Sequence, residues 1–291
     1  MNKNNLSYKN VYLPFKKSLY GGNRIKKQKR NNFLFTIITV VLNDKDNIEE
    51  TIKSVINQKK NLEYIIIDGG SKDGTIEVIK KYEKHVDLWI SENDEGIFDA
   101  MNKGLIYASG KYLGIINSGD LYNENALNII EKYFAKKDNI DFIFGTVKKK
   151  KVKHGFSPRK ILWSFDFYPS HSSGFFIKNE VQKKLGLYDV SFKLSADHDL
   201  FYRMLKEKFK GLSTKKKELI GTFRKVNVSY SSTFSAEDHL NEEINIRLNH
   251  FQNKLLIILI LVNNYLQKIF KKKKYRISTQ FLINKIFYIF K

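Results

Sequence analysis

The sequence contains no cysteine, so disulfides, zinc sites built on cysteine and cysteine nucleophiles are all excluded. It also lacks a signal-peptide pattern, because residues 1–33 are polar and basic and hold no apolar segment before a cleavage site. The longest unbroken apolar run, Leu255–Val262, is much shorter than the roughly 20 residues of a membrane-spanning helix. These absences predict a soluble or peripheral protein, and the lack of cysteine is compatible with a reducing cytoplasm.

Acidic residues are few relative to basic ones, with 30 Asp and Glu against 52 Lys and Arg and a formal net charge of +22. A positive field of this size attracts nucleic acid, anionic lipid or phosphorylated ligands. The alternative is a compositional origin for part of the charge, since Lys, Asn and Ile are abundant together, as expected from an AT-rich genome. No recognisable nucleic-acid-binding module accompanies the charge, so we expect no nucleic acid as a partner.

The length of 291 residues is enough for one large domain or one domain plus a small appendage, and the 42% of apolar residues supports a substantial core. From residue 34 onward, apolar strands alternate with helices, which predicts an α/β fold with a mainly parallel sheet and helices on both faces. Asp46 and Glu49 are candidates to cap the first helix, and the lysine-rich run 148–153 is expected to be a loop. Strands are predicted at 33–42, 62–67, 86–90, 111–116, 141–145, 174–177 and 219–223, and helices at 48–56, 76–82, 97–108, 124–135 and 196–208.

Polar loops follow the first four predicted strands, namely Asn43–Asp44, Asp68–Gly74, Glu92–Gly96 and Asn117–Asp120. Ligands of open parallel sheets bind outside the carboxyl ends of the strands, where these loops would converge. Each loop alone consists of ordinary turn formers, but four of them at one edge favour a binding site. An edge rich in carboxylates suits a divalent cation held together with substrate phosphates. Neither the phosphate-loop motif nor the dinucleotide-binding motif is present.

Five segments occur in order over roughly residues 34–205: TIITVVLNDKDNIEETIKSVINQ, YIIIDGGSKDGTIEVIKKY, DEGIFDAMNKGL, YLGIINSGD and SADHDLFYRML. They resemble the family-two glycosyltransferases of GT-A fold, and within them the group that makes bacterial surface polysaccharides. The resemblance implies an inverting glycosyltransferase of the hexosyltransferase type. Its donor would be a nucleotide sugar, usually UDP-linked, and its acceptor a saccharide or lipid-linked saccharide. Capsule, exopolysaccharide or lipopolysaccharide assembly is the implied pathway.

The resemblance also assigns residues to the donor site. Asp68 matches the aspartate that accepts a hydrogen bond from the base, and Asp120 matches the last position of the so-called DxD region. Asp120 would therefore be the ligand of a divalent metal, Mn²⁺ or Mg²⁺. Asn117 and Gly119 stand where many relatives carry aspartates, so Asp120 is the only carboxylate of this loop. The remaining residues expected to line the donor are Asn43, Asp94, Gly96, Asp99, Asn102 and Asn117.

The resemblance places the catalytic base at Asp197 and a histidine near the diphosphate or acceptor at His171. Removal of the acceptor hydroxyl proton by a positioned carboxylate contributes about 10²–10⁴-fold to such a reaction. Asp199 opens the same predicted helix two residues later and points to another face, so it is the second candidate for the base. The alternative for both aspartates is a favourable charge at a helix N-terminus. His198, between them, is expected to be structural or exposed.

The last part of the chain predicts helices with apolar faces and basic flanks. The run Leu255–Val262 is followed by Lys271–Lys274 and by a second apolar cluster between Phe281 and Phe290. Such helices suit the interface of an anionic membrane, and the alternative is packing against the catalytic domain or a second copy. We therefore expect a basic tail over 1–33, a catalytic domain over 34–225 and a helical, membrane-associating region over 226–291. The expected location is the cytoplasm, at the inner face of the plasma membrane.

The sequence is also compatible with two other functions. The altered DxD region also fits a catalytically inactive relative that serves as a binding or assembly subunit, although Asp68, Asp120 and Asp197 are intact. The net charge also fits a nucleic-acid-binding protein, whose affinity would depend strongly on salt.

Overall fold

The computed structural model describes residues 18–25, 32–136, 139–165, 167–224, 234–250, 252–270 and 278–290. The chain divides into two compact units. Unit 1 comprises Met1–Phe156, Pro169–Val190 and Lys208–Val226, and unit 2 comprises Ser157–Tyr168, Ser191–Glu207 and Asn227–Lys291. Unit 2 therefore takes two segments from within the predicted 34–225 domain as well as the C-terminal stretch.

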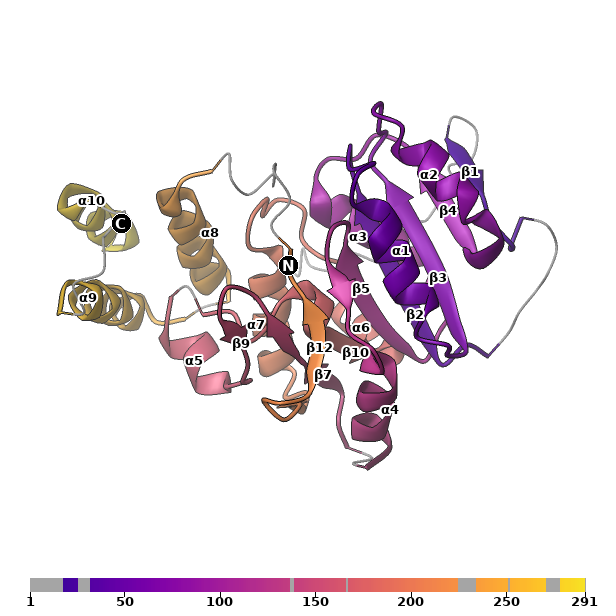
Figure 1. The fold of residues 1–291 in the computed structure, drawn as a ribbon. Helices are drawn as coiled ribbons and strands as arrows, with labels where there is room; N and C mark the ends of the chain where they lie inside the picture. The colour runs from indigo at the N-terminus through magenta and orange to yellow at the C-terminus, as the bar shows by residue number, and fades with distance from the viewer. Residues whose placement is uncertain are drawn as a thin grey trace. The chain divides into compact units, whose positions relative to one another are not determined.

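An eight-stranded sheet forms the centre of unit 1, in the order β1-β4-β3-β2-β5-β10-β7-β11 (Figure 1). The four neighbouring strands from β4 to β5 are parallel to one another, whereas β10 runs antiparallel to both of its neighbours. The sheet is thus mixed, with a parallel half as predicted. Its strands are β1 (Leu19–Gly21), β2 (Phe35–Val41), β3 (Leu62–Asp68), β4 (Leu88–Ser91), β5 (Tyr112–Asn117), β7 (Phe142–Phe144), β10 (Phe175–Lys178) and β11 (Gly211–Ser213).

The central strand β2 is buried along its whole length because both faces of the sheet are covered. On one face Ile37 packs in a core with Ile48 and Ile52 of helix α1. On the other face Gly104 of α3 approaches so closely that a Cβ there would lie 2.4 Å from Ile38 Cγ2. The helices of unit 1 are α1 (Ile48–Ile56), α2 (Thr75–Lys81), α3 (Ile97–Tyr107), α4 (Ala126–Lys136) and α6 (Asn179–Leu185), with short 3-10 turns at Glu83–His85 and Ser172–Gly174.

Three local expectations differ from the structure. Asn47, not Asp46, is the N-cap of α1, and its side chain makes no capping bond. Strand β1 lies within the stretch predicted to be a tail, and it pairs antiparallel with β4. The lysine run 148–153 is not a simple loop but a hairpin of β8 (Thr146–Lys148) and β9 (Val152–Lys153). This hairpin belongs to a second sheet, in the order β6-β12-β8-β9, with β6 at Leu121–Tyr122 and β12 at Leu219–Thr222.

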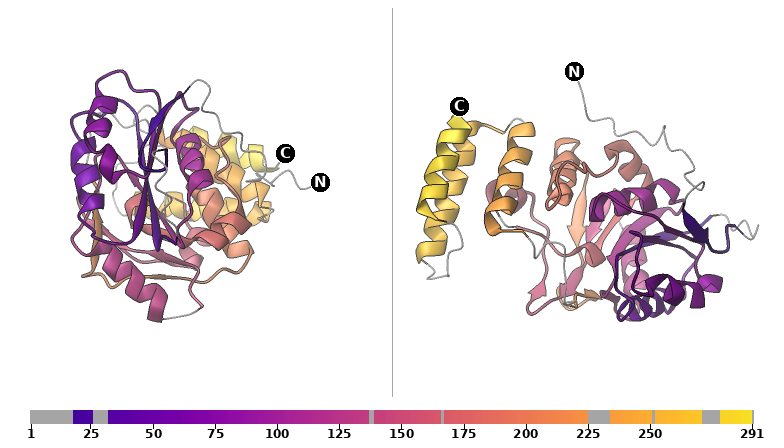
Figure 2. Two further views of the ribbon diagram at one scale, coloured as in Figure 1. Left: turned by 90° about the vertical axis from the view of Figure 1, so that its right-hand side faces the viewer. Right: turned by 90° about the horizontal axis from the view of Figure 1, so that it is seen from above.

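Unit 2 is helical. Ser235 and Asp238 form the predicted capping box at the start of α8, with each side chain bonded to the other's backbone N–H. Helices α9 and α10 lie side by side (Figure 2) and share an apolar core with α8, in which Ile257 and Ile289 are buried. In the described part of the chain no helix is long and apolar enough to cross a membrane. The helices are α5 (Pro158–Trp163), α7 (Ala196–Lys206), α8 (Ala236–Asn249), α9 (Lys254–Phe270) and α10 (Thr279–Phe290).

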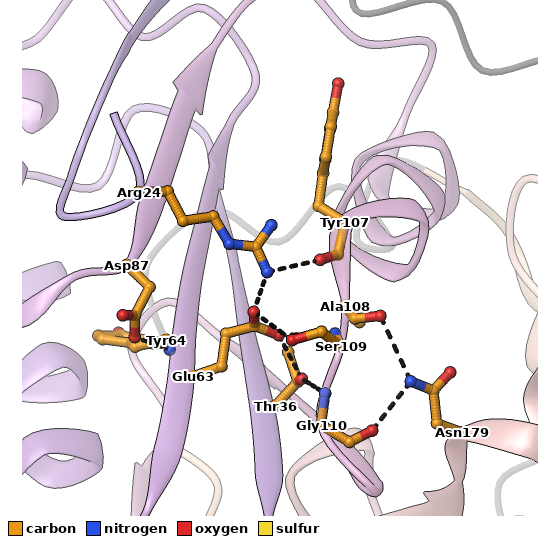
Figure 3. Close-up of polar contacts among 10 residues, drawn as sticks. All are labelled: Arg24, Thr36, Glu63, Tyr64, Asp87, Tyr107, Ala108, Ser109, Gly110 and Asn179. Carbon is orange, nitrogen blue, oxygen red and sulfur yellow. Dashed lines mark hydrogen bonds and ion pairs between the residues drawn. The ribbon is translucent and has the colours of Figure 1, made fainter. Parts of the chain in front are cut away.

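A buried carboxylate joins several elements at the amino-terminal ends of the strands (Figure 3). Glu63 of β3 is fully buried and accepts hydrogen bonds from the Thr36 hydroxyl at 2.6 Å and from the Ser109 N–H and hydroxyl at 2.7 Å each. Arg24, just after β1, pairs with the same carboxylate and donates to the Tyr107 carbonyl at 2.9 Å. Glu63 therefore connects β1, β2, β3 and the turn between α3 and β5.

Replacing Glu63 with alanine should lower the free energy of unfolding by about 3 kcal/mol. The change leaves the buried Thr36 hydroxyl without its acceptor, which costs about 1–3 kcal/mol, and it also removes the acceptor of the Ser109 N–H and hydroxyl. Loss of the ion pair with Arg24 contributes less to the change in free energy, because the Arg24 side chain is 32% exposed and can be solvated. Urea unfolding measures the change, with Glu131→Ala as the control, since Glu131 takes part in a surface pair with Lys60. Equal midpoints for the two variants would contradict this role of Glu63.

Candidate functional site

The strand order places a switch point between β2 and β5. The chain moves from β2 to β3 and β4 on one side, whereas β5 lies on the other side of β2. In sheets of this kind ligands bind in the crevice outside the carboxyl ends of the strands at that point. The Ser118 hydroxyl donates to Asp44 Oδ2 at 2.6 Å, which ties the loop after β5 to the loop after β2 across the switch point.

The other loops at this edge are tied together in the same way. Asn43, with a left-handed backbone at φ 48°, donates its N–H to the Ser71 hydroxyl at 2.7 Å. Its side-chain oxygen accepts the Lys72 N–H at 2.9 Å, and the Glu92 N–H donates to the Asp68 carbonyl at 3.0 Å. The predicted convergence of the loops after β2, β3, β4 and β5 therefore exists within unit 1.

Asp68 is fully buried at the end of β3, and its carboxylate accepts hydrogen bonds from the loop that follows it. Its Oδ2 accepts the Gly70 and Ser71 N–H groups at 3.1 and 3.0 Å and the Ser91 hydroxyl at 2.6 Å. The Ser71 hydroxyl also bonds to Oδ1. Asp68 thus holds the loops after β3 and β4 in place.

Asp94, Gly96 and Asp99 lie together in the loop after β4 and the first turn of α3. Asp94 Oδ1 accepts the Gly96 N–H at 3.0 Å, and Gly96 has φ 124° with open space where a Cβ would project. Burial raises the pKa of Asp94, and the charges of Asp99 and Asp68 raise it further. Asp99 pairs with Lys103 at 3.2 Å. A partly buried loop with clustered carboxylates can accept hydrogen bonds from hydroxyl and amide groups of a ligand.

Asn102 is placed differently from its neighbours in the predicted donor site. Its side-chain amide donates to the Tyr188 carbonyl at 2.9 Å, and its oxygen accepts the Tyr188 N–H at 2.8 Å. Asn102 is also buried. Because this reciprocal pair already uses both polar groups, the geometry gives Asn102 a positioning role, joining α3 to the stretch after α6.

The loop after β5 carries two buried oxygens that accept no hydrogen bond within the described residues, Asn117 Oδ1 and Asp120 Oδ2. His171 Nδ1 lies 3.1 Å from Asp120 Oδ2, and Asp120 Oδ1 accepts the Arg224 N–H at 3.3 Å. Thr51 of α1 fixes this loop by accepting the Gly119 N–H and donating to the Asp120 carbonyl, each at 2.9 Å.

Buried oxygen atoms that accept no hydrogen bond fit a hard divalent cation, which takes one or two carboxylates and completes its shell with phosphate oxygens. Among the described residues no three His, Asp or Glu side chains form a complete metal cluster. A metal at Asp120 would therefore depend on oxygens from the donor diphosphate.

Asp197 and Asp199 open helix α7 in unit 2, and their surroundings differ. Asp197 Oδ1 accepts the His198 N–H at 2.8 Å, and the side chain also bonds to Tyr168. Burial raises the pKa of Asp197, and the hydrogen bonds and the charge of His198 counter only part of this rise. A carboxylate with a raised pKa is the better proton acceptor at neutral pH.

Asp199 is buried and uses both carboxylate oxygens in ion pairs. Oδ2 meets Arg203 Nε at 2.8 Å and Oδ1 meets His250 Nε2 at 2.9 Å. Burial alone would raise the pKa of Asp199, but the His250 hydrogen bond and the Arg203 charge outweigh it and lower this pKa. The geometry therefore favours Asp197 over Asp199 as a proton acceptor.

His198 has more partners than the sequence suggested. Its Nδ1 lies 3.3 Å from Glu243 Oε1, and its ring stacks on Tyr168 with centroids 5.8 Å apart. Burial would lower the pKa of His198, but the carboxylates of Glu243 and Asp197 outweigh burial and raise it to about 9. Nothing in the local sequence reveals this pairing, because Glu243 lies on α8 and follows 45 residues later.

Carboxylates from several loops therefore converge at the switch point, the place where α/β enzymes bind their ligands. The profile of glycosyl transferase family 2 matches residues 36–201, more than half of the chain. The protein belongs to this family and is a glycosyltransferase, as its motifs predicted.

Several curated relatives share this part of the chain. An uncharacterized glycosyltransferase of Mycobacterium tuberculosis is 32% identical over 179 residues, which cover 58% of this chain and 67% of the relative. The minor teichoic acid biosynthesis protein GgaB of Bacillus subtilis is 26% identical over 201 residues, covering 63% of this chain and 22% of GgaB.

Solved structures confirm the predicted fold. TarS 1–349 of S. aureus in complex with UDP superimposes with a TM-score of 0.60 at 16% identity, covering 78% of this chain and 70% of that one. The mannosyltransferase PcManGT of Pyrobaculum calidifontis, in complex with GDP-Man and Mn²⁺, gives a TM-score of 0.56 at 15% identity, covering 80% and 75%.

Proposed function

We propose that the protein transfers a sugar from a nucleoside diphosphate donor to a saccharide of a bacterial surface polymer, with inversion at the anomeric carbon. The observation that carries this proposal is the pair of buried oxygens at the switch point of the sheet, Asn117 Oδ1 and Asp120 Oδ2, which accept no hydrogen bond from the described residues, with His171 beside the second. The relatives named for teichoic acid biosynthesis support a surface polymer as acceptor, and the solved relatives with UDP and GDP-Man support a nucleoside diphosphate donor.

Asp120 and His171 are the residues that would hold a divalent metal, together with oxygens of the donor. When bound, the metal would supply charge neutralisation at the diphosphate. Asn43, Asp94, Gly96 and Asp99 would line the donor, and Asp68 would reach the base only by exchanging one of its present hydrogen bonds.

Asp197 would take the proton of the acceptor hydroxyl as that oxygen bonds to the anomeric carbon. Its raised pKa matches that task, and the Tyr168 and His198 contacts hold the carboxylate in place. Since a single displacement needs no covalent enzyme intermediate, one base is enough for inversion.

A panel of nucleotide sugars tests the proposed function. The protein would be incubated with UDP- and GDP-linked sugars, with Mn²⁺, Mg²⁺ or EDTA, and nucleotide release would be measured with and without saccharide acceptors. We expect release from one class of donor, stimulated by acceptor and by metal. If every donor stays intact and calorimetry detects no binding of UDP or GDP, the proposed function is wrong.

We further propose that α9 and α10 hold the enzyme at an anionic membrane surface, where a lipid-linked acceptor resides. Large apolar side chains are exposed on both helices, and Lys285 lies 4.8 Å from the Tyr288 ring. Lys271–Lys274, which also motivated this proposal, lie outside the described residues. The exposed apolar residues are Leu255, Leu259, Leu266, Ile283, Phe287 and Tyr288.

Replacing Leu259 and Phe287 together with glutamine should weaken liposome binding by at least about tenfold, since each buried side chain contributes about 1.5–3 kcal/mol. The two side chains are 58% and 66% exposed, so the fold should be unaffected. Leu19→Gln on β1 is the matched control, because Leu19 is 57% exposed. Co-sedimentation with anionic liposomes at low and high salt measures the effect. Wild-type protein that stays in the supernatant at low salt would refute membrane binding.

A further inference from the structure

One lysine of the β8–β9 hairpin differs from its neighbours. Lys149 is half-buried, whereas Lys148, Lys150 and Lys151 are exposed. The Lys149 ammonium lies 4.0 Å from the centroid of the Phe223 ring. That ring meets the ring of His171 edge-on, with centroids 4.8 Å apart. His171 Nδ1 lies 3.1 Å from Asp120 Oδ2, so these four side chains form a continuous series, which we call the Lys149 stack.

The backbone holds the Lys149 stack in position. The Phe223 N–H donates to the Lys148 carbonyl at 2.8 Å, which extends the pairing of β12 with β8 by one residue. The next residue, Arg224, donates its N–H to Asp120 Oδ1 at 3.3 Å. The end of β12 is therefore bonded to the hairpin on one side and to the proposed metal ligand on the other, and it fixes the spacing between Lys149 and Asp120.

The ammonium of Lys149 has no carboxylate within ion-pair distance in the described part of the chain. Arg224, the other cation near Asp120, does have one, because it pairs with Glu50. Burial lowers the pKa of Lys149, the charge of Lys153 lowers it further, and the Asp120 carboxylate acts in the opposite direction. A half-buried ammonium that lacks a counter-ion is costly, and an arriving anion removes that cost. The loop beside it supplies one carboxylate only, since Asn117 and Gly119 occupy the other positions.

We propose that Lys149 binds the diphosphate of the donor and stabilises it as the leaving group, sharing this task with the metal. The inference rests on the proposed function. In the transfer step the acceptor oxygen bonds to the anomeric carbon, the bond from that carbon to the phosphate oxygen breaks, and its electron pair stays on the phosphate. The hydroxyl proton goes to Asp197, and the added negative charge develops near the Lys149 ammonium. A fixed cation at that place is worth more than one in water.

Calorimetry in metal-free buffer with EDTA tests the inference on a binding series of uridine, UMP and UDP, and on the guanosine equivalents. Wild-type affinity should rise with the second phosphate. Lys149→Ala should lose about tenfold or more in diphosphate affinity, as expected for a bond between charged groups, with nucleoside affinity unchanged. Lys149→Arg should keep most of the diphosphate affinity. Lys150→Ala, which removes an exposed charge next to it, is the matched control and should resemble the wild type.

Turnover gives a second measurement, since Lys149→Ala should lower kcat and increase the dependence of the remaining activity on Mn²⁺. Unchanged diphosphate affinity in Lys149→Ala would overturn the inference, and so would an equal loss in Lys150→Ala, because net charge alone would then explain it. If the wild type binds neither UDP nor GDP even with Mn²⁺, the proposed function itself fails and the inference fails with it, whereas a wild type that binds them with Mn²⁺ but not in EDTA refutes the inference alone. A wild type that binds UDP or GDP while Lys149→Ala binds equally well would refute this inference alone.

Discussion

Replacing Asp197 with asparagine should lower sugar transfer by about 10²–10⁴-fold, the usual contribution of a positioned general base. Asparagine has nearly the same shape and can still accept the His198 N–H bond, but it cannot take up a proton. The loss should therefore appear in kcat, while the affinity for the donor nucleotide stays at the wild-type value. Steady-state kinetics together with nucleotide titration separate the two quantities.

The pH dependence provides an independent check on the same residue. Asp197 must be ionised to act as a base, and burial raises its pKa. Activity should therefore fall as the pH drops through a value above the usual aspartate pKa of about 3.9. The residual activity of Asp197→Asn should not show this fall at low pH.

Asp199→Asn is the matched control, since it removes the same charge two residues away. It breaks the ion pairs with Arg203 and His250, so its main effect should be on stability. Breaking a buried pair by removing one partner costs about 3–5 kcal/mol. A stable, inactive Asp199→Asn beside an active Asp197→Asn would show that the base is Asp199.

The parallel half of the fold could be predicted because its signals are local. Strand β2 is a continuous run of β-branched and apolar residues and is buried throughout, and the helix after it has one apolar face. The polar loops then follow at the carboxyl ends, and parallel strands bring such ends to one edge. The family motifs cover the same part of the chain, which is why the fold and the family were predicted together.

The contacts that the sequence did not reveal are long-range and polar. Strand β1 has three residues and depends on pairing with β4, about 70 residues later. Glu63 stands in an apolar run, and its donors come from Thr36, Ser109 and Arg24. Such partners cannot be inferred from propensity or period, because both describe only near neighbours in the chain.

The same limit applies within the candidate site. Asn102 matches a donor-site motif, yet its side chain is already used by the backbone of Tyr188. Conversely, Lys149 belongs to a lysine run in which sequence alone favours no member. Which residue of a motif or a charge run faces the site is decided by strand pairing, here that of β8 with β9 and β12.

Replacing Asp120 with asparagine should remove the gain in nucleotide affinity that Mn²⁺ gives the wild type. Asp120 is the only carboxylate of its loop, and its buried Oδ2 accepts no hydrogen bond in the described part of the chain and lies 3.1 Å from His171 Nδ1. Changes in residues that merely support a metal ligand already cost about 10–100-fold in metal affinity. Loss of a ligand with a full charge should cost at least as much.

Calorimetric titration of UDP and GDP, with Mn²⁺ and with EDTA, measures this effect in wild type and variant. Asparagine keeps an oxygen that can accept the Arg224 N–H, so the thermal unfolding midpoint should change little. Asp46→Asn is the matched control, since Asp46 is exposed at the same edge of the sheet. If Asp120→Asn still gains nucleotide affinity from Mn²⁺ as the wild type does, Asp120 is not the metal ligand. A loss confined to titrations with Mn²⁺ would separate the role of Asp120 from that of Lys149, whose effect must persist in EDTA.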